Sequence, residues 1–180
     1  MKPEIKAQDS MGNGTAMESS TAMESSTSIE IKLDDLSGGE VVELLEEHLA
    51  DMYATSPAES VHALDLDGLK SPEITFFSAW KDNQLLGCVA IKELDAQHAE
   101  LKSMRTSQFA RKSGVASQLL QHVIDTATVR QYQTISLETG SEDYFKAARN
   151  LYEKFGFGYC EPFADYVLDP HSQFMSIELR

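Results

Sequence analysis

The order in which strand-like and helix-like patterns follow one another is the feature that most constrains the fold of this chain. Two apolar segments of strand character, residues 74–80 and 85–93, flank the turn-forming residues 81–84, and this arrangement predicts an antiparallel hairpin. Residues 97–106 again alternate between apolar and polar side chains, which predicts a further strand. The central region therefore predicts an antiparallel meander.

Helical and strand patterns then alternate towards the carboxyl end. Helices are predicted over residues 113–130 and 143–155, the second ending at Gly156, and residues 133–138 between them predict a strand. The other expected elements are a strand at 29–33, a helix at 41–52, a short helix at 60–69, and strands at 159–163 and 174–179. The sum is a single mixed α/β domain in which the meander feeds a strand–helix–strand–helix unit.

Residues 1–28 differ in composition from the rest of the chain. They are rich in Ser, Thr, Gly, Met and Glu, and the sextet Ala-Met-Glu-Ser-Ser-Thr at residues 16–21 recurs at once at residues 22–27. A segment with so few branched or aromatic side chains cannot bury enough apolar surface to offset the entropy lost on ordering. We therefore expect a disordered, low-complexity tail at residues 1–28 and one folded domain at residues 29–180.

The charge balance argues against several classes of partner. The chain of 180 residues has 15 Lys and Arg against 29 Asp and Glu, which gives a net charge of -14. Such acidity argues against binding to nucleic acid or to an anionic membrane surface. No apolar run reaches the roughly 20 residues that cross a bilayer. Because residues 1–14 also lack the apolar core of a secretory signal, we expect a cytoplasmic protein.

The sequence also gives no support for metal binding or for a nucleophilic cysteine. The two cysteines are too few for a disulfide framework, and Cys88 falls in an apolar strand pattern that is typical of a core residue. The five histidines share no ligand spacing with Cys or acidic residues. We therefore expect no metal site, and we place the histidines at the surface or at the edge of the core.

The junction between the strand at 97–106 and the following helix carries the most informative functional pattern. A helix start presents unpaired backbone N–H groups and the positive end of the helix dipole, which favour an anion such as a phosphate. Gly114 leaves room for a phosphate to approach the backbone, and Arg111 and Lys112 add positive charge there. Taken alone, the same residues also fit an ordinary helix start with a solvated basic pair.

The spacing Arg111-x-x-Gly114-x-Ala116 resembles motif A of the GCN5-related N-acetyltransferase (GNAT) superfamily. A second stretch, Leu-Tyr-Glu-Lys-Phe-Gly-Phe at residues 151–157, is similar to another signature of that superfamily and follows at the expected distance. Within the superfamily, the chain most resembles the bacterial YsnE-like acetyltransferases. That resemblance rests on Glu-x-Lys-x-Met at residues 100–104 and Pro-Phe-Ala-Asp-Tyr at residues 162–166, and the whole resemblance covers roughly residues 29–180.

The resemblance implies a mixed, mostly antiparallel sheet, flanked by helices, whose central strands splay apart to admit acetyl-CoA as a co-substrate. The backbone of three strand residues is implied to bond the pantetheine arm: Met104, Arg105 and Thr106. The turn into the next helix is implied to wrap the pyrophosphate through Arg111, Lys112, Ser113, Gly114, Val115 and Ala116. Many members carry an Asn seven residues before the helix Tyr, where this chain has Phe145, so the role of that Asn is not implied here.

Acetyl transfer from a thioester to an amine also needs groups that move protons. A protonated amine must lose a proton before it attacks, and the departing thiolate benefits from a proton donor. The resemblance implies Tyr152 as that donor, although an aromatic residue at this position also fits the edge of a core. Glu138, at a strand end, and Glu100 are rival candidates for the base. A solvated carboxylate is the alternative for Glu138, and an ion pair with a neighbouring Lys or Arg is the alternative for Glu100.

We therefore expect an enzyme that moves the acetyl group of acetyl-CoA to a primary amine of a small molecule by direct attack in a ternary complex. Two alternatives stay open, namely acetylation of a protein Lys or N-terminal amine, and a non-catalytic acyl-CoA-binding regulatory module. Many members of the superfamily pair through their carboxyl-terminal strands, so the resemblance is also compatible with a homodimer.

Overall fold

A computed structural model describes residues 28–180, in which one sheet has the strand order β1-β2-β3-β4-β5-β7-β6. The predicted tail at residues 1–28 lies, apart from Ser28, outside the described residues. The strands are β1 (Glu30–Leu33), β2 (Ile74–Lys81), β3 (Gln84–Glu93), β4 (His98–Thr106), β5 (Thr134–Gly140), β6 (Gly158–Tyr159) and β7 (Ser172–Glu178). Neighbouring strands run antiparallel except β4 and β5, which are parallel.

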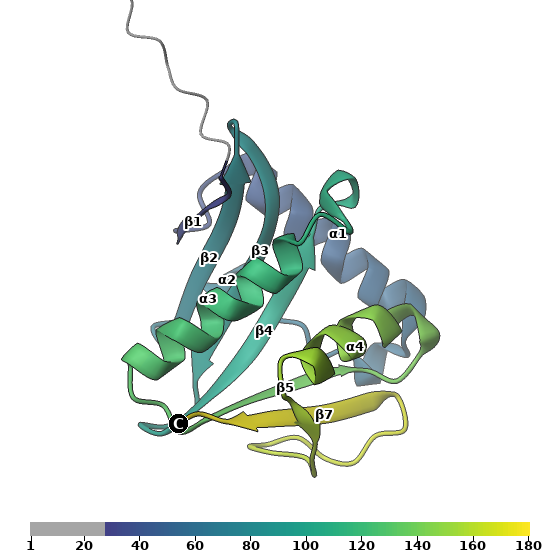
Figure 1. Ribbon diagram of the computed structural model, residues 1–180. Helices are drawn as coiled ribbons and strands as arrows, with labels where there is room; N and C mark the ends of the chain where they lie inside the picture. Colours follow the sequence, from purple (N-terminus) through teal and green to yellow (C-terminus); the bar gives the residue numbers. More distant parts are fainter. Residues whose placement is uncertain (1–27) are drawn as a thin grey trace, which may run out of the picture.

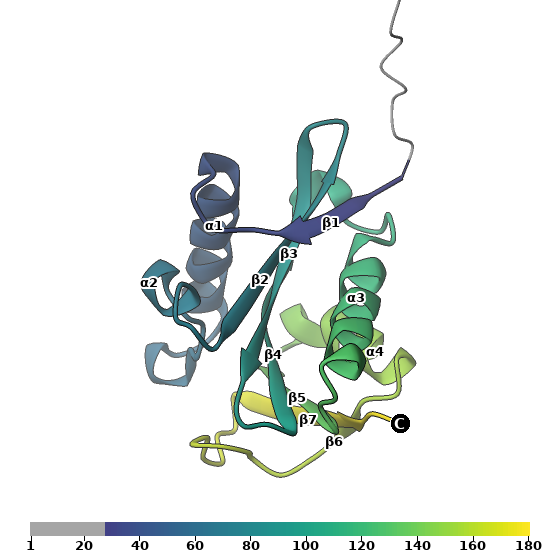
Figure 2. The ribbon, with the colours of Figure 1, turned by 90° about the vertical axis from the view of Figure 1, so that its left-hand side faces the viewer.

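The helices cover both faces of this sheet. On one face lie α1 (Gly39–Thr55) and α2 (Leu66–Leu69), and on the other lie α3 (Val115–Val129) and α4 (Lys146–Lys154), as Figure 1 and Figure 2 show. Three short 3-10 turns connect these elements: η1 (Ala58–Ser60), η2 (Gln108–Ala110) and η3 (Asp143–Phe145). The expected mixed α/β architecture, with a meander followed by a strand–helix–strand–helix unit, is confirmed.

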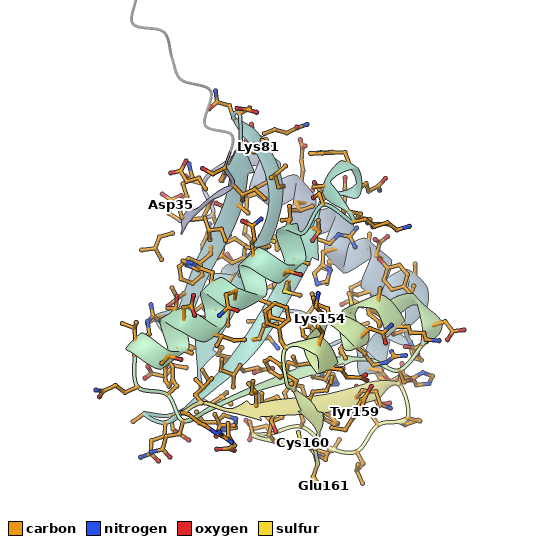
Figure 3. The ribbon with its side chains drawn as sticks, viewed as in Figure 1. Asp35, Lys81, Lys154, Tyr159, Cys160 and Glu161 are labelled. Atoms are coloured by element: carbon orange, nitrogen blue, oxygen red, sulfur yellow. The ribbon has the colours of Figure 1, made fainter. Side chains whose placement is uncertain are left out.

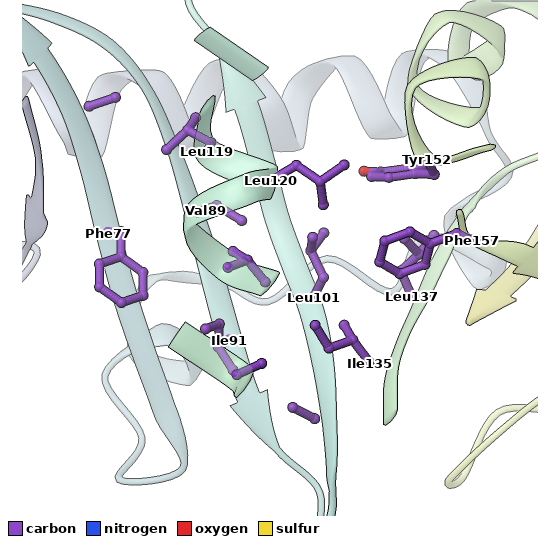
Figure 4. Packing of buried hydrophobic residues seen from close by; sticks show 14 of the residues in the cluster. Phe77, Val89, Ile91, Leu101, Leu119, Leu120, Ile135, Leu137, Tyr152 and Phe157 are labelled. Carbon is purple, nitrogen blue, oxygen red and sulfur yellow. The ribbon is translucent and has the colours of Figure 1, made fainter. Parts of the chain in front are cut away.

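Each face of the sheet has its own apolar core. Successive side chains of a strand point to opposite faces, so Val89 of β3 packs against Leu119 and Leu120 of α3 (Figure 4). The neighbouring residue Cys88 instead joins the second core, which includes Val41 of α1. A strand covered on both sides reads as a continuous apolar run, which explains the composition of residues 85–91.

Three predicted elements are shorter or begin differently in the structure. The helix expected at 60–69 is α-helical only over Leu66–Leu69, because the Asp65 side chain accepts a hydrogen bond from the Gly68 N–H and starts the helix there. The helix expected at 143–155 opens with the 3-10 turn η3 before α4 begins. The strand expected at 159–163 stops at Tyr159, and Pro162, which has no N–H to donate, follows soon after. No helix in the described part of the chain is long and apolar enough to cross a bilayer.

Candidate active site

β4 and β5 separate in the middle of the sheet. Their parallel pairing ends at Leu101 and Leu137, after which β4 continues to Thr106 alongside β3 alone. A bulge interrupts β4 at Ser103, whose φ of 52° lies in the left-handed region. Figure 1 shows the two strands diverging, with β4 running upward and β5 to the right. The expectation of splayed central strands is therefore confirmed.

A cavity of about 90 Å³ lies where the two strands diverge. Its lining includes Glu138, Tyr152 and Met104, three of the residues singled out from the sequence. α1 and the segment before α2 also contribute to the lining, through His48 and His62. Because α1 and α4 lie on opposite faces of the sheet, this cavity connects the two faces.

Glu138 is the carboxylate of this cavity. It lies near the end of β5, and burial raises its pKa to about 7 by penalising the charged form. A carboxyl group that titrates near neutral pH can accept a proton and return it under ordinary conditions. The alternative of a fully solvated strand-end carboxylate does not fit this environment.

Tyr152 reaches the same cavity from α4. Its side chain is buried, and its ring packs beside that of Phe157 with 5.8 Å between the centroids. Figure 4 shows the ring extending from α4 towards Leu120, with the hydroxyl at its tip. Burial, and then the charge of Glu138, raise the pKa of Tyr152, so the phenol stays protonated and able to donate.

Glu100 is also buried, but its carboxylate is already engaged. Its Oε1 atom lies 3.1 Å from the Nζ of Lys102 and accepts a second hydrogen bond from the Tyr166 hydroxyl. The ion pair with a neighbouring Lys, one of the alternatives for this residue, is thus present. Glu100 is absent from the lining of the cavity that holds Glu138 and Tyr152.

The predicted phosphate-binding turn leads directly into α3. Gly114 precedes the helix with a φ of 84°, a conformation that glycine adopts without strain, and no side chain caps the first N–H groups of the helix. A Cβ at Gly114 would meet no atom within 4 Å, so the backbone there is open to a ligand. Four residues of the turn are exposed: Arg111, Lys112, Ser113 and Gly114. Val115 and Ala116 form the first turn of α3.

Arg105 differs from the other predicted cofactor residues because its side chain is buried and bonded within the protein. The guanidinium lies 2.6 Å from the Asp51 carboxylate of α1 and donates to the Tyr144 hydroxyl of η3 at 3.0 Å. Only the Arg105 backbone is therefore left for the contact with pantetheine that the family resemblance implies. Neither Asp51 nor Tyr144 was identified as a partner of Arg105 from the sequence, since contacts between distant segments leave no local pattern.

Two histidines line the cavity at partly exposed positions, which agrees with the expected placement at the surface or the core edge. His48 continues the apolar stripe of α1, between Leu44 and Met52, and this position was the one available clue to its direction. Burial lowers the pKa of His48 to about 4, so the ring is neutral at pH 7. The ring of His62 packs against that of Tyr166 at 5.1 Å.

Two other kinds of site were considered from the sequence, namely a nucleophilic cysteine and a metal site. Cys88 is fully buried, and burial raises the pKa of its thiol to about 12, so it is the predicted core residue and not a nucleophile. Within residues 28–180, no three His, Cys, Asp or Glu side chains gather in a way that would hold a metal ion.

Residues 41–157 match the Acetyltransferase (GNAT) family. The chain belongs to this family. Among GNAT relatives, it is 58% identical over 149 residues to the uncharacterized N-acetyltransferase YsnE of Bacillus subtilis (strain 168), covering 83% of this chain and 99% of YsnE. It is also 36% identical over 137 residues to the IAA acetyltransferase of Azospirillum brasilense, covering 76% of this chain and 86% of that protein.

Solved GNAT structures share the fold. An acyl-CoA N-acyltransferase from Klebsiella pneumoniae superposes with a TM-score of 0.72 at 25% identity, covering 84% of this chain and 98% of that chain. A Bacillus subtilis acetyltransferase solved in complex with CoA gives a TM-score of 0.60 at 17% identity, covering 85% of this chain and 100% of that chain. The family resemblance stated from the sequence is confirmed, and the chain is an acyl-CoA-dependent N-acetyltransferase.

Proposed function

We propose that this enzyme transfers the acetyl group of acetyl-CoA to a primary amine of a small molecule by direct attack in a ternary complex. The observation that carries this proposal is the meeting of Glu138 and Tyr152 at one cavity. The two residues come from β5 and α4, and the cavity lies where β4 and β5 separate. One residue is suited to accept a proton and the other to donate one.

The residues along β4 and at the start of α3 fit acetyl-CoA. The backbone of Met104, Arg105 and Thr106 lies beyond the last β4–β5 pair, where an extended pantetheine arm can take the place of a strand. The turn from Arg111 to Ala116 supplies two basic side chains, an open glycine and uncapped helix N–H groups for the pyrophosphate. The thioester, held there, supplies the activated acetyl group.

Glu138, Tyr152 and solvent account for the protons that move in this reaction. The acceptor attacks as a free amine, after its ammonium form has lost one proton to solvent. The amine nitrogen forms a bond to the acetyl carbon and gives a proton to the Glu138 carboxylate, directly or through a water molecule, while the bond from that carbon to sulfur breaks. The Tyr152 hydroxyl donates its proton to the departing thiolate, so that CoA leaves as the thiol. The Tyr152 oxygen regains a proton from solvent or from Glu138 before the next turnover.

A small acceptor fits the site better than a protein segment. The cavity of about 90 Å³ is small, which favours a compact acceptor. The loop between β6 and β7 covers the neighbouring face of the sheet through Tyr166, whose hydroxyl bonds to Lys102 and Glu100.

The test is release of CoA thiol from acetyl-CoA with a panel of small primary amines and a Lys-containing peptide. We expect turnover with at least one small amine, and a loss of about 100-fold in kcat for Tyr152→Phe and for Glu138→Gln. Tyr132→Phe is the matched control, because Tyr132 is a second buried tyrosine but bonds to Glu93, away from the cavity. Turnover with the peptide alone would support a protein acceptor. Acetyl-CoA binding without thiol release for any acceptor would support the regulatory module and overturn the proposal.

A further inference from the structure

Tyr166 connects two stretches of sequence that lie far apart. It belongs to the loop between β6 and β7, and its hydroxyl donates to the Oε1 of Glu100 at 2.5 Å. The same hydroxyl accepts a hydrogen bond from the Nζ of Lys102 at 2.9 Å. The segments at residues 100–104 and 162–166, each noted separately in the sequence, therefore meet in one hydrogen-bonded cluster.

Lys102 is the centre of this cluster. Its Nζ donates to the Glu100 carboxylate at 3.1 Å, to the Tyr166 hydroxyl at 2.9 Å and to the backbone carbonyl of His62 at 3.3 Å. These three acceptors use all the protons of an ammonium group. Lys102 is thus held in one position and has no proton left for a substrate.

The cluster is shielded from water. The Lys102 and Glu100 side chains are 9% and 3% exposed, and the Tyr166 ring packs against Phe163 at 5.0 Å and Phe174 at 5.5 Å. Charges in such a setting act on each other more strongly than charges at the surface. A buried ion pair of this kind is tolerated only when its hydrogen bonds are satisfied, as they are here.

Glu138 lies on the same face of the sheet as this cluster. Glu100 is opposite Ser136 in the register of β4 and β5, and Glu138 follows Ser136 by two residues, so alternation puts both carboxylates on one face. The charged or titratable groups around Glu138 come from every element packed near it. They are Lys102 and Glu100 of β4, Tyr166 and Asp169 of the β6–β7 loop, Tyr152 of α4, and His48 and His62 on the α1 face.

We propose that Lys102 is a positioning residue for acetyl transfer: fixed by Tyr166 and His62, it holds Glu100 as a paired charge and leaves Glu138 to take the proton of the acceptor amine. This inference rests on the proposed function. It gives the two neighbouring carboxylates different tasks, since one is neutralised by a permanent partner and the other exchanges protons. The β6–β7 loop then has a role in the site as well, because Tyr166 keeps the Lys102 ammonium in place.

The charges of Lys102 and Glu100 act on the pKa of Glu138 in opposite directions, and this opposition provides the test. The Glu138 carboxyl carbon is titrated by NMR in the complete protein labelled at glutamate, with Glu138→Gln used to assign its resonance. Lys102→Met is expected to move the midpoint to higher pH, and Glu100→Gln to lower pH, each by about half a unit or more. Tyr166→Phe, which frees Lys102 from one partner, is expected to shift the midpoint in the same direction as Lys102→Met and by less.

Controls and a second variant keep the outcome interpretable. Lys154→Met removes a charge at the exposed end of α4, and Tyr159→Phe removes a hydroxyl from the exposed edge strand β6 (Figure 3); neither residue belongs to the cluster, and neither change should move the midpoint. If Lys102→Met fails to fold, Glu100→Gln combined with Lys102→Met removes both charges together and should leave the midpoint near that of the wild type.

The proposal is overturned if the single changes at Lys102 and Glu100 shift the midpoint in the same direction or not at all. It is equally overturned if the carboxyl that titrates near neutral pH belongs to Glu100. The titration needs no substrate, so it can fail or succeed independently of the proposed acetyl transfer. Where a primary amine is turned over, the acid limb of the pH profile of CoA release should follow the same shifts.

Discussion

The guanidinium of Arg105 and the carboxylate of Asp51 lie 2.6 Å apart and join β4 to α1 beside the candidate active site. The Tyr144 hydroxyl of η3 bonds to both groups, at 3.0 Å from Arg105 and 2.9 Å from Asp51. Because η3 follows β5, this contact links the two sides of the divergence between β4 and β5. It fixes the relative placement of elements that contribute to the cavity.

Replacing Asp51 should loosen this link. In Asp51→Asn the buried Arg105 loses its counter-charge, and we expect a loss of about 1 kcal/mol in unfolding free energy at pH 7, limited because Asp51 is partly exposed. The bond to Arg105 lowers the pKa of Asp51, so its stabilisation is present above the unfolded pKa and is lost as the pH falls through the folded pKa. Urea unfolding at neutral and acid pH measures this difference. Asp125→Asn, at an exposed position of α3, should change stability little at either pH.

Gly114→Ala should separate ligand binding from folding. The positive φ costs an alanine about 1 kcal/mol, but no protein atom lies within reach of the new methyl group. We expect a small drop in melting temperature together with a loss of tenfold or more in affinity for acetyl-CoA, measured by calorimetry. Gly38→Ala changes the glycine that precedes α1, where φ is -79°, and should leave the affinity intact. Unchanged affinity in Gly114→Ala would contradict the assignment of the phosphate-binding turn.

Gly87 of β3 is a position where the backbone of β4 approaches too closely for any side chain. An added Cβ would lie 2.7 Å from the carbonyl oxygen of Arg105 and 3.1 Å from Leu119. We expect Gly87→Ala to destabilise the fold by about 1–3 kcal/mol in chemical unfolding, as overpacking does. Gly39→Ala, in the first turn of α1 with no atom nearby, should be neutral or slightly stabilising. Equal effects of the two changes would contradict this prediction.

The partly buried carboxyl of Glu138 should make the stability of the protein fall as the pH rises. Partial burial raises its pKa in the folded state to about 7, well above the usual range of a glutamate carboxyl, so the folded state holds the proton more tightly. Its contribution to stability is therefore full below the unfolded pKa and is lost as the pH rises through 7. Glu138→Gln should become more stable relative to the wild type between pH 5 and pH 8, by up to roughly 3 kcal/mol. Thermal unfolding across this range checks the sign, and Glu153→Gln at the surface is the control.

The local patterns of the chain determined most of the elements. The hairpin between β2 and β3 follows from its turn, where Asp82 and Asn83 adopt φ values of 49° and 61°, which these residue types tolerate well. Gly156, with a φ of 95°, ends the α4 region as predicted. The shorter β6 and α2 were not foreseen, because apolar patterns do not encode the details on which they depend. These are the hydrogen bond that the Gly68 N–H donates to the Asp65 side chain and the limited pairing of β6 with β7.

The candidate site was predictable only where a motif marks it. Tyr152 and the turn before α3 followed from the family resemblance and Glu138 from its place at a strand end, and the structure adds the environment of each. Arg105 and Asp51 are 54 residues apart in the sequence, and Lys102 and Tyr166 are 64 residues apart. No local spacing pattern could therefore predict these contacts. The direction of the His48 side chain is likewise decided by the packing of α1 against the sheet.

Because β4 diverges from β5, backbone hydrogen bonds between these two strands are missing beyond Leu101 and Leu137. An extended ligand lying there would supply hydrogen bonds in their place and would connect the β1–β4 half of the sheet to the half formed by β5, β7 and β6. Binding of the ligand should therefore also make the sheet more rigid. The protein with ligand bound should have a higher melting temperature and exchange its β4 amide hydrogens more slowly than the protein without ligand. The substrate would serve, for as long as it stays, as a structural member of the fold.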